Sequence, residues 1–170
     1  MKSVQHRFSW SLILGIFLLA GCAVPQHFWS QKDIVEFDVN TIPGQRTVLI
    51  ASRASEYKKQ LVAELQKQLS AAHISHITIG VKQLHKIDPI DYAAVVVINT
   101  CLAWGLDHEV STFLDSQKTT SNIILFTTSS EGSWLPDKHG LDFDAISGAS
   151  VKANVGDVAR NLMERIQKRL

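Results

Sequence analysis

The 170-residue chain is poor in the residues that mark specialised proteins: it has two cysteines, four prolines and nine glycines. So few cysteines exclude a disulfide scaffold, and so little proline and glycine excludes a collagen-like or low-complexity chain. Its 17 basic and 16 acidic residues nearly cancel, which argues against nucleic acid as a partner. What the chain does have is 45% hydrophobic residues, enough for one ordinary packed domain.

Only one long apolar run is present, from Trp10 to Ala20, and it follows the basic residues Lys2 and Arg7. The run is shorter than the roughly 20 residues that a membrane-spanning helix needs. A basic segment, a short apolar run and then small residues are typical of a secretory signal peptide. The stretch Leu19-Ala20-Gly21-Cys22 resembles the lipobox of bacterial lipoproteins, in which cleavage precedes a cysteine that then receives lipids.

This resemblance implies a signal peptide at residues 1–21, a lipidated Cys22 with a tether at 22–46, and a domain at 47–170. Several acyl chains would anchor the protein stably, since each buried methylene contributes about 0.8 kcal/mol. Ala23 stands where inner-membrane lipoproteins usually have Asp, which favours the outer membrane with the domain facing the periplasm. The expected partners are the membrane and an envelope protein.

From Thr47 onward, short apolar runs alternate with amphipathic stretches of helical period. The expected strands lie within residues 48–51, 74–81, 93–98, 123–126 and 143–146, and the expected helices within 57–69, 106–114 and 155–170. Runs without polar alternation indicate strands buried on both faces, as in parallel sheets. We therefore predict an α/β three-layer sandwich with a five-stranded parallel sheet. A short added strand is compatible with Ile34, Val35, Phe37 and Val39.

Four parts of the chain together resemble flavodoxin-like domains: residues 48–69, 91–115, 122–132 and 142–170. The similarity includes Thr127-Thr128-Ser129 after the fourth strand and Phe113-Leu114 in the helix after the third. The resemblance implies a strand order of 2-1-3-4-5. Flavodoxins hold flavin mononucleotide (FMN) without a covalent bond and carry electrons. In such open sheets, ligands bind in the loops that follow the strands.

The phosphate loop of that family reads Thr/Ser-x-Thr-Gly-x-Thr, and this chain has Ser52-Arg53-Ala54-Ser55-Glu56-Tyr57 in the same place. Only Ser52 stands at a matching position. Arg53 could pair with a phosphate, whereas Glu56 would repel one. The alternative interpretation is that Ser52 or Ser55 simply caps the following helix.

Two tryptophans follow the third and fourth expected strands, Trp104 and Trp134. In flavodoxins these two loops hold the flavin ring, often between aromatic side chains, so both residues are candidates for stacking a planar ligand. Alternatively, each indole covers the rim of the core.

Asp144-Ala145-Ile146-Ser147-Gly148-Ala149-Ser150 resembles the motif at which a periplasmic transferase esterifies flavin to the final hydroxyl. That resemblance makes Ser150 a candidate acceptor. A strand that ends in a Gly-containing turn before a helix explains the same residues without a flavin.

Catalytic and metal sites have weaker signals. Cys101, Asp107 and His108 lie close together in sequence, as an activated thiol would require, but Cys101 is equally compatible with a small buried apolar residue. The remaining histidines lack ligand spacing, so no metal site is expected. We expect a non-catalytic binding or scaffolding module without a cofactor. The alternative is an electron-transfer protein that holds FMN or another flavin.

Overall fold

The computed structural model describes residues 31–35 and 39–170, which contain one six-stranded sheet. Cys22 and the predicted signal peptide lie outside the described residues. The strands are β1 (Val39–Asn40), β2 (Val48–Ser52), β3 (His76–Gly80), β4 (Ala94–Thr100), β5 (Ile123–Ser129) and β6 (Asp144–Ala149). Their order is β1-β3-β2-β4-β5-β6. The five parallel strands thus have the predicted order 2-1-3-4-5, which is confirmed.

Beside these five parallel strands the sheet has a sixth strand at one edge, where β1 pairs with β3 in the antiparallel sense. The physical reason is the short connection between β1 and β2, which turns at Gly44 with a φ of 82°. A short connection reverses the chain, whereas parallel neighbours need a long crossover.

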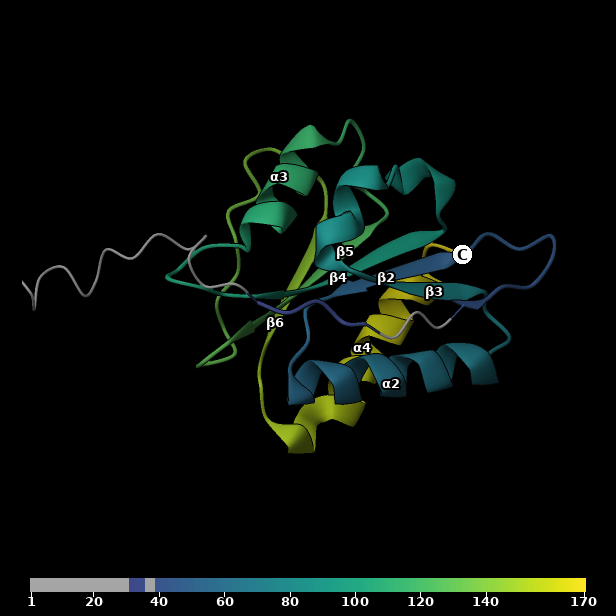
Figure 1. Cartoon of the computed structure of the whole chain (residues 1–170), viewed down its shortest axis with the longest axis horizontal. Coiled ribbons are helices and arrows are strands. Elements are labelled where there is room, and N and C mark those ends of the chain that lie inside the picture. Colours follow the sequence, from purple (N-terminus) through teal and green to yellow (C-terminus); the bar gives the residue numbers. More distant parts are fainter. Residues whose placement is uncertain (1–30, 36–38) are drawn as a thin grey trace, which may run out of the picture. The chain divides into compact units, whose positions relative to one another are not determined.

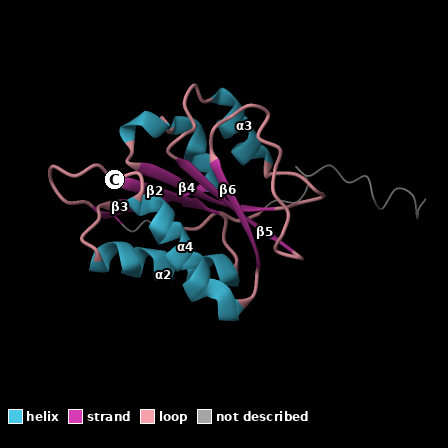
Figure 2. Ribbon diagram, turned by 180° about the vertical axis from the view of Figure 1, so that it is seen from behind, coloured by secondary structure: helices cyan, strands magenta, loops and turns pink. Residues whose placement is uncertain are grey.

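Helices cover both faces of the sheet, so the three-layer prediction is confirmed (Figures 1 and 2). On one face lie α2 (Glu56–Ala71) and α4 (Val155–Gln167), which pack against each other. On the other lie α3 (His108–Ser116) and the 3-10 helix η2 (Val81–Lys86). The other two 3-10 helices are η3 (Pro89–Asp91) and η4 (Lys152–Asn154).

The central strands are apolar on both faces because both faces are covered. In β4, Val96 and Ile98 join the core beneath α2 and α4, while Val95 and Val97 join the core beneath α3. All four side chains are fully buried. Burial of each such side chain stabilises the fold by about 1.5–3 kcal/mol.

The compact unit extends from Gln31 to Leu170, so the predicted domain start at residue 47 lies inside it. Hydrogen bonds tie the preceding segment to the domain: Asn40 Nδ2 donates to Ser70 Oγ over 3.2 Å and the Ile42 N–H to Ser75 Oγ over 2.7 Å. Part of the segment assigned to the tether therefore belongs to the folded unit.

Candidate functional site

The loops that follow β2, β4, β5 and β6 meet at one end of the sheet, because parallel strands all point the same way. We call this the carboxyl end of the sheet. It contains every cofactor-binding residue predicted from the sequence.

The loop after β2 is occupied by the chain's own residues 31–34, which we call the N-terminal strap. The Ala54 N–H donates to the Lys32 carbonyl over 2.6 Å, and the Ile34 N–H donates to the Ser52 carbonyl over 3.3 Å. The backbones of Asp33 and Arg53 pair as an isolated antiparallel β-bridge between the two segments. The strap thus engages the backbone of the stretch that resembles a phosphate loop.

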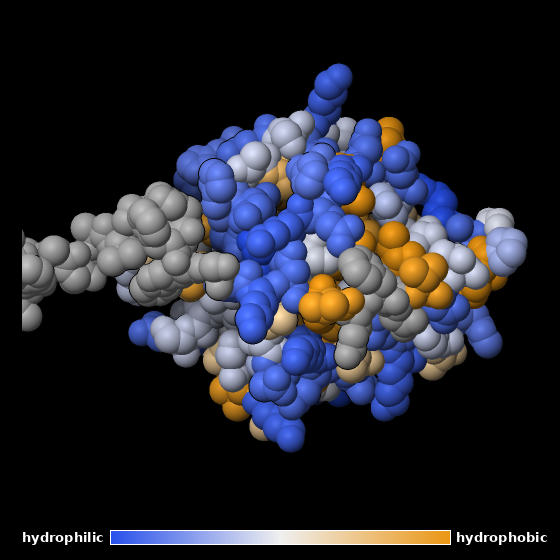
Figure 3. All heavy atoms as spheres, in the orientation of Figure 1, coloured by the Kyte–Doolittle hydropathy of each residue, from blue (hydrophilic) through white to orange (hydrophobic). Residues whose placement is uncertain are grey.

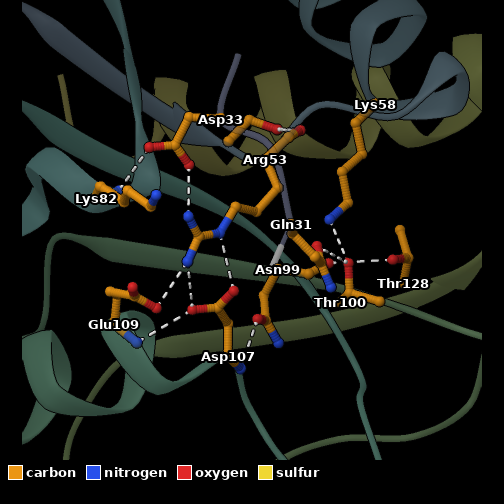
Figure 4. A network of polar contacts seen from close by, with 11 residues as sticks. Gln31, Asp33, Arg53, Lys58, Lys82, Asn99, Thr100, Asp107, Glu109 and Thr128 are labelled. Atoms are coloured by element: carbon orange, nitrogen blue, oxygen red, sulfur yellow. Dashed lines mark hydrogen bonds and ion pairs between the residues drawn. The ribbon is translucent and has the colours of Figure 1, made fainter. Parts of the chain in front are cut away.

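Arg53 is held by three carboxylates, and with Asp33, Asp107 and Glu109 it forms what we call the Arg53 cluster (Figure 4). Its NH1 lies 2.7 Å from Asp33, its Nε 2.9 Å from Asp107, and its NH2 2.7 Å from Glu109. Only 4% of Arg53 is exposed. Burial acts to lower its pKa, but the ion pairs with Asp107 and Asp33 outweigh burial and raise it. The guanidinium is permanently charged, and each of its three nitrogens has a carboxylate partner.

Asp107 is the buried partner in this cluster. Burial acts to raise its pKa, and hydrogen bonds from Arg53 and from the Glu109 N–H more than offset that effect, so the pKa is lowered. Asp107 also caps α3, and its own N–H donates to Asn99 Oδ1 over 3.0 Å. The start of α3 is therefore fixed to the ends of β2 and β4.

Asp33 reaches past Arg53 to the end of β3. Its Oδ2 accepts a hydrogen bond of 3.1 Å from the Lys82 N–H. A Cβ atom on Gly80 would lie only 2.6 Å from that oxygen, so the close approach of the strap needs glycine there.

Lys58 is a buried amine next to the cluster. It is 3% exposed and donates to Thr100 Oγ1, which in turn donates to Gln31 Oε1 of the strap over 3.3 Å (Figure 4). Burial is the main cause that lowers the Lys58 pKa to about 8, although nearby Asp107 acts to raise it. The ammonium group thus lies in an environment that disfavours its charge.

Two serines of the predicted phosphate loop have local structural roles. Ser55 caps α2 by accepting from the Lys58 N–H over 3.2 Å, which matches the alternative interpretation of the sequence. Ser52 is fully buried, and its hydroxyl donates to the Arg53 carbonyl over 2.9 Å.

The structure brings Trp104 and Trp134 to the same cavity, of about 310 Å³. Cys101, Ser129 and Glu131 also line it. Burial raises the pKa of Cys101, so this thiol is not activated as a nucleophile. The binding of a planar ring between the two indoles stays a prediction.

Ser150 is exposed just beyond β6, and it does not line that cavity. Asp144, the first residue of the flavinylation-like motif, forms ion pairs with Arg165 and Arg169 at the opposite end of the strand. In an extended strand the two motif ends lie about 20 Å apart. The motif therefore forms an ordered edge strand of the sheet, and Ser150 as a flavin acceptor stays a prediction.

Four charged or polar residues of this region were not predicted as site residues: Asp33, Lys58, Thr100 and Glu109. The sequence does indicate that Lys58 is buried, because Leu61, Val62 and Leu65 follow it at helical spacing on the apolar face of α2. No sequence pattern indicates the role of Asp33, since its partners Arg53 and Lys82 lie far away in the sequence.

The sheet order and the helices on both of its faces define a flavodoxin-like α/β fold, in which the N-terminal strap lies against the loop after β2. No family model and no curated protein sequence matches the chain. Among the described residues, no helix is long and apolar enough to cross a membrane, and no cluster of three or more His, Cys, Asp or Glu side chains is placed to hold a metal ion.

Solved structures with the same fold include a short-chain flavodoxin associated with a bacterial microcompartment, with a TM-score of 0.52 and 11% identity. That match covers 73% of this chain and 98% of the flavodoxin. A flavodiiron core from Synechocystis sp. PCC6803 matches with a TM-score of 0.51 and 9% identity over 74% of this chain, but only 36% of its own length is covered. At such low identity, the similarity shows the fold alone.

The N-terminal strap should depend on Asp33. We expect Asp33→Ala to lower the free energy of unfolding by about 1–3 kcal/mol, because it leaves one donor of the buried Arg53 guanidinium and the Lys82 N–H without their acceptor. Amide hydrogen exchange of residues 31–35 should accelerate. Asp137→Ala, at a side chain that is 77% exposed, is the control and should change neither measurement. Unchanged exchange in the Asp33 variant would contradict the proposed role.

Lys58 should make stability depend on pH. Its pKa of about 8 in the folded chain lies below the ordinary 10.5. The unfolded chain therefore binds more protons between these values, and stability rises with pH across that window, by up to about 3 kcal/mol. We expect Lys58→Met to be more stable than the wild type at pH 7 and to lose this advantage towards pH 10, as measured by urea denaturation. Lys59→Met, at an exposed neighbour, is the control. If the difference in free energy of unfolding between Lys58→Met and the wild type stays constant with pH, burial does not lower the pKa of Lys58.

Proposed function

We propose that the protein is a lipid-anchored, non-catalytic binding domain of the bacterial envelope, flavodoxin-like in fold but without a site for the FMN phosphate. The observation that carries the proposal is the N-terminal strap in the loop after β2. It occupies the Ala54 N–H that would otherwise face an anion, and it adds the carboxylate of Asp33.

Electrostatics supports this proposal. A phosphate site presents open N–H groups and positive charge at a helix N-terminus. Here the Arg53 cluster sets one guanidinium against three carboxylates, so its formal charge is −2. A phosphate dianion brought to the same place would meet this excess of negative charge in a poorly solvated environment. The phosphate of FMN does not fit these residues.

A second candidate function is supported by the cavity between Trp104 and Trp134. Its volume of about 310 Å³ lies at the low end of small-molecule sites, and its two indoles suit a flat ring. A flavin held there by its ring alone, with no protein site for a phosphate, would supply electron transfer when bound. Trp134 would form the half-buried wall and Trp104 the exposed rim.

Flavin titration separates the two functions. If the strap replaces the phosphate, FMN should bind no more tightly than riboflavin, which has the same ring and no phosphate. Quenching of tryptophan emission measures both affinities. Trp134→Ala should abolish any binding that depends on the ring.

FMN affinity at least about tenfold above that of riboflavin would show a working phosphate site and contradict the first proposal. Purified protein that retains one equivalent of flavin would favour the electron-transfer function. A colourless protein that takes up neither flavin would eliminate the second candidate and leave the binding domain.

The lipid anchor has its own test. We expect Cys22→Ser to prevent acylation, because the modified cysteine is the anchor, and to release the protein from the outer membrane or leave it unprocessed. Cys101→Ser should be processed and fractionate as the wild type does. Cell fractionation and the mass of the N-terminal peptide measure both outcomes. A Cys22 variant that stays with the outer membrane would refute lipidation.

A further inference from the structure

The loop after β4 begins with a tight hairpin turn at Leu102–Gly105. The Gly105 N–H donates to the Leu102 carbonyl over 2.9 Å, and the Leu102 N–H donates to the Gly105 carbonyl over 3.1 Å. The two central residues are Ala103, with a φ of 46°, and Trp104, with a φ of 64°. Such turns favour glycine and asparagine at these positions, so a tryptophan there is strained. Backbone strain of this kind often marks a functional residue.

Trp104 is also exposed to an unusual degree. Its exposed fraction is 80%, and in Figure 1 the loop after β4 projects beyond the sheet. Hydrophilic residues predominate on the face drawn in Figure 3, and exposed apolar residues are scattered over it. At the carboxyl end, however, Leu135 and Val151 follow β5 and β6 and are each 53% exposed. Two further exposed apolar side chains thus belong to the loops that follow strands at the same end of the sheet as the strained indole.

The chain enters the domain at this same end. Gln31 accepts a hydrogen bond from Thr100, the last residue of β4, and Asp33 is fixed by Arg53. Cys22 precedes Gln31 by nine residues. A fully extended chain spans at most about 3.6 Å per residue, so a connection of this length can reach no further than about 32 Å.

We infer that the hairpin turn Leu102–Gly105 docks on the bilayer, with Trp104 at the level of the lipid headgroups. The inference rests on the proposed lipid anchor at Cys22, which would keep this end of the domain next to the membrane. An indole suits that place because its ring is apolar and its N–H can still reach water or a headgroup. The strained turn then holds the ring outward, and the strap fixes the side of the domain that faces the lipid.

The test uses the processed, lipidated protein in vesicles of phosphatidylethanolamine and phosphatidylglycerol with brominated acyl chains. Two variants each leave one tryptophan in the mature chain: Trp29→Phe with Trp134→Phe leaves Trp104, and Trp29→Phe with Trp104→Phe leaves Trp134. We expect brominated lipid to quench Trp104 at least about twofold more strongly than Trp134, and to shield Trp104 from aqueous acrylamide.

Equal quenching of the two residues, or unchanged acrylamide access to Trp104, would overturn the inference. The mass of the N-terminal peptide separates this failure from failure of the anchor. Protein that carries acyl chains but shows no quenching of Trp104 overturns the docking alone, whereas protein without acyl chains that does not sediment with vesicles overturns both proposals.

A purely structural role for Trp104 predicts a different result. Trp104→Gly relieves the positive φ and removes an indole that is 80% exposed, so we expect its melting temperature to equal or exceed that of the wild type. A lower melting temperature would show that the indole stabilises the turn, and would overturn the assignment to the membrane.

Discussion

The carboxyl end of this domain is organised by a single buried guanidinium. An unpaired buried charge is very costly, so Arg53 has to be matched by acceptors wherever the chain can supply them. Asp33 comes from the strap, and Asp107 and Glu109 come from the start of α3. The strap, the loop after β2 and the first turn of α3 are therefore interdependent, and displacing any one of them leaves the guanidinium short of partners.

This constraint divides the carboxyl end into two parts. The part above β2 and β3 is closed, because Asp33 lies against Gly80 and bonds the Lys82 N–H. The part above β4 and β5 stays open, with a cavity between Trp104 and Trp134. Under the proposed function, the closed part excludes the phosphate of a nucleotide, and the open part is the candidate place for a flat ring.

Sequence pattern was enough for the sheet because the main signal is local. The runs at Val48–Ser52, Ala94–Thr100 and Ile123–Ser129 are buried on both faces, and uninterrupted apolar residues report that burial directly. The sequence is compatible with the two-residue strand β1 but does not predict its pairing, since pairing with β3 depends on a turn and on distant partners. The cluster around Arg53 could not be predicted for the same reason: Asp33 and Asp107 approach it from 20 and 54 residues away.

The departures of the loop after β2 from a phosphate-binding pattern are mutually consistent. Arg53 stands where its guanidinium can meet Asp33 of the strap. Ala54 offers only its N–H, which the Lys32 carbonyl accepts, and has no hydroxyl that would need a second partner in the closed space. Tyr57 packs at the start of α2 and donates to Asn154 Oδ1 over 3.0 Å, linking α2 to the segment before α4. Arg53 and Ala54, two of the residues that depart from the phosphate-binding pattern, are thus the residues that contact the strap, so the same substitutions that disfavour an anion favour the strap.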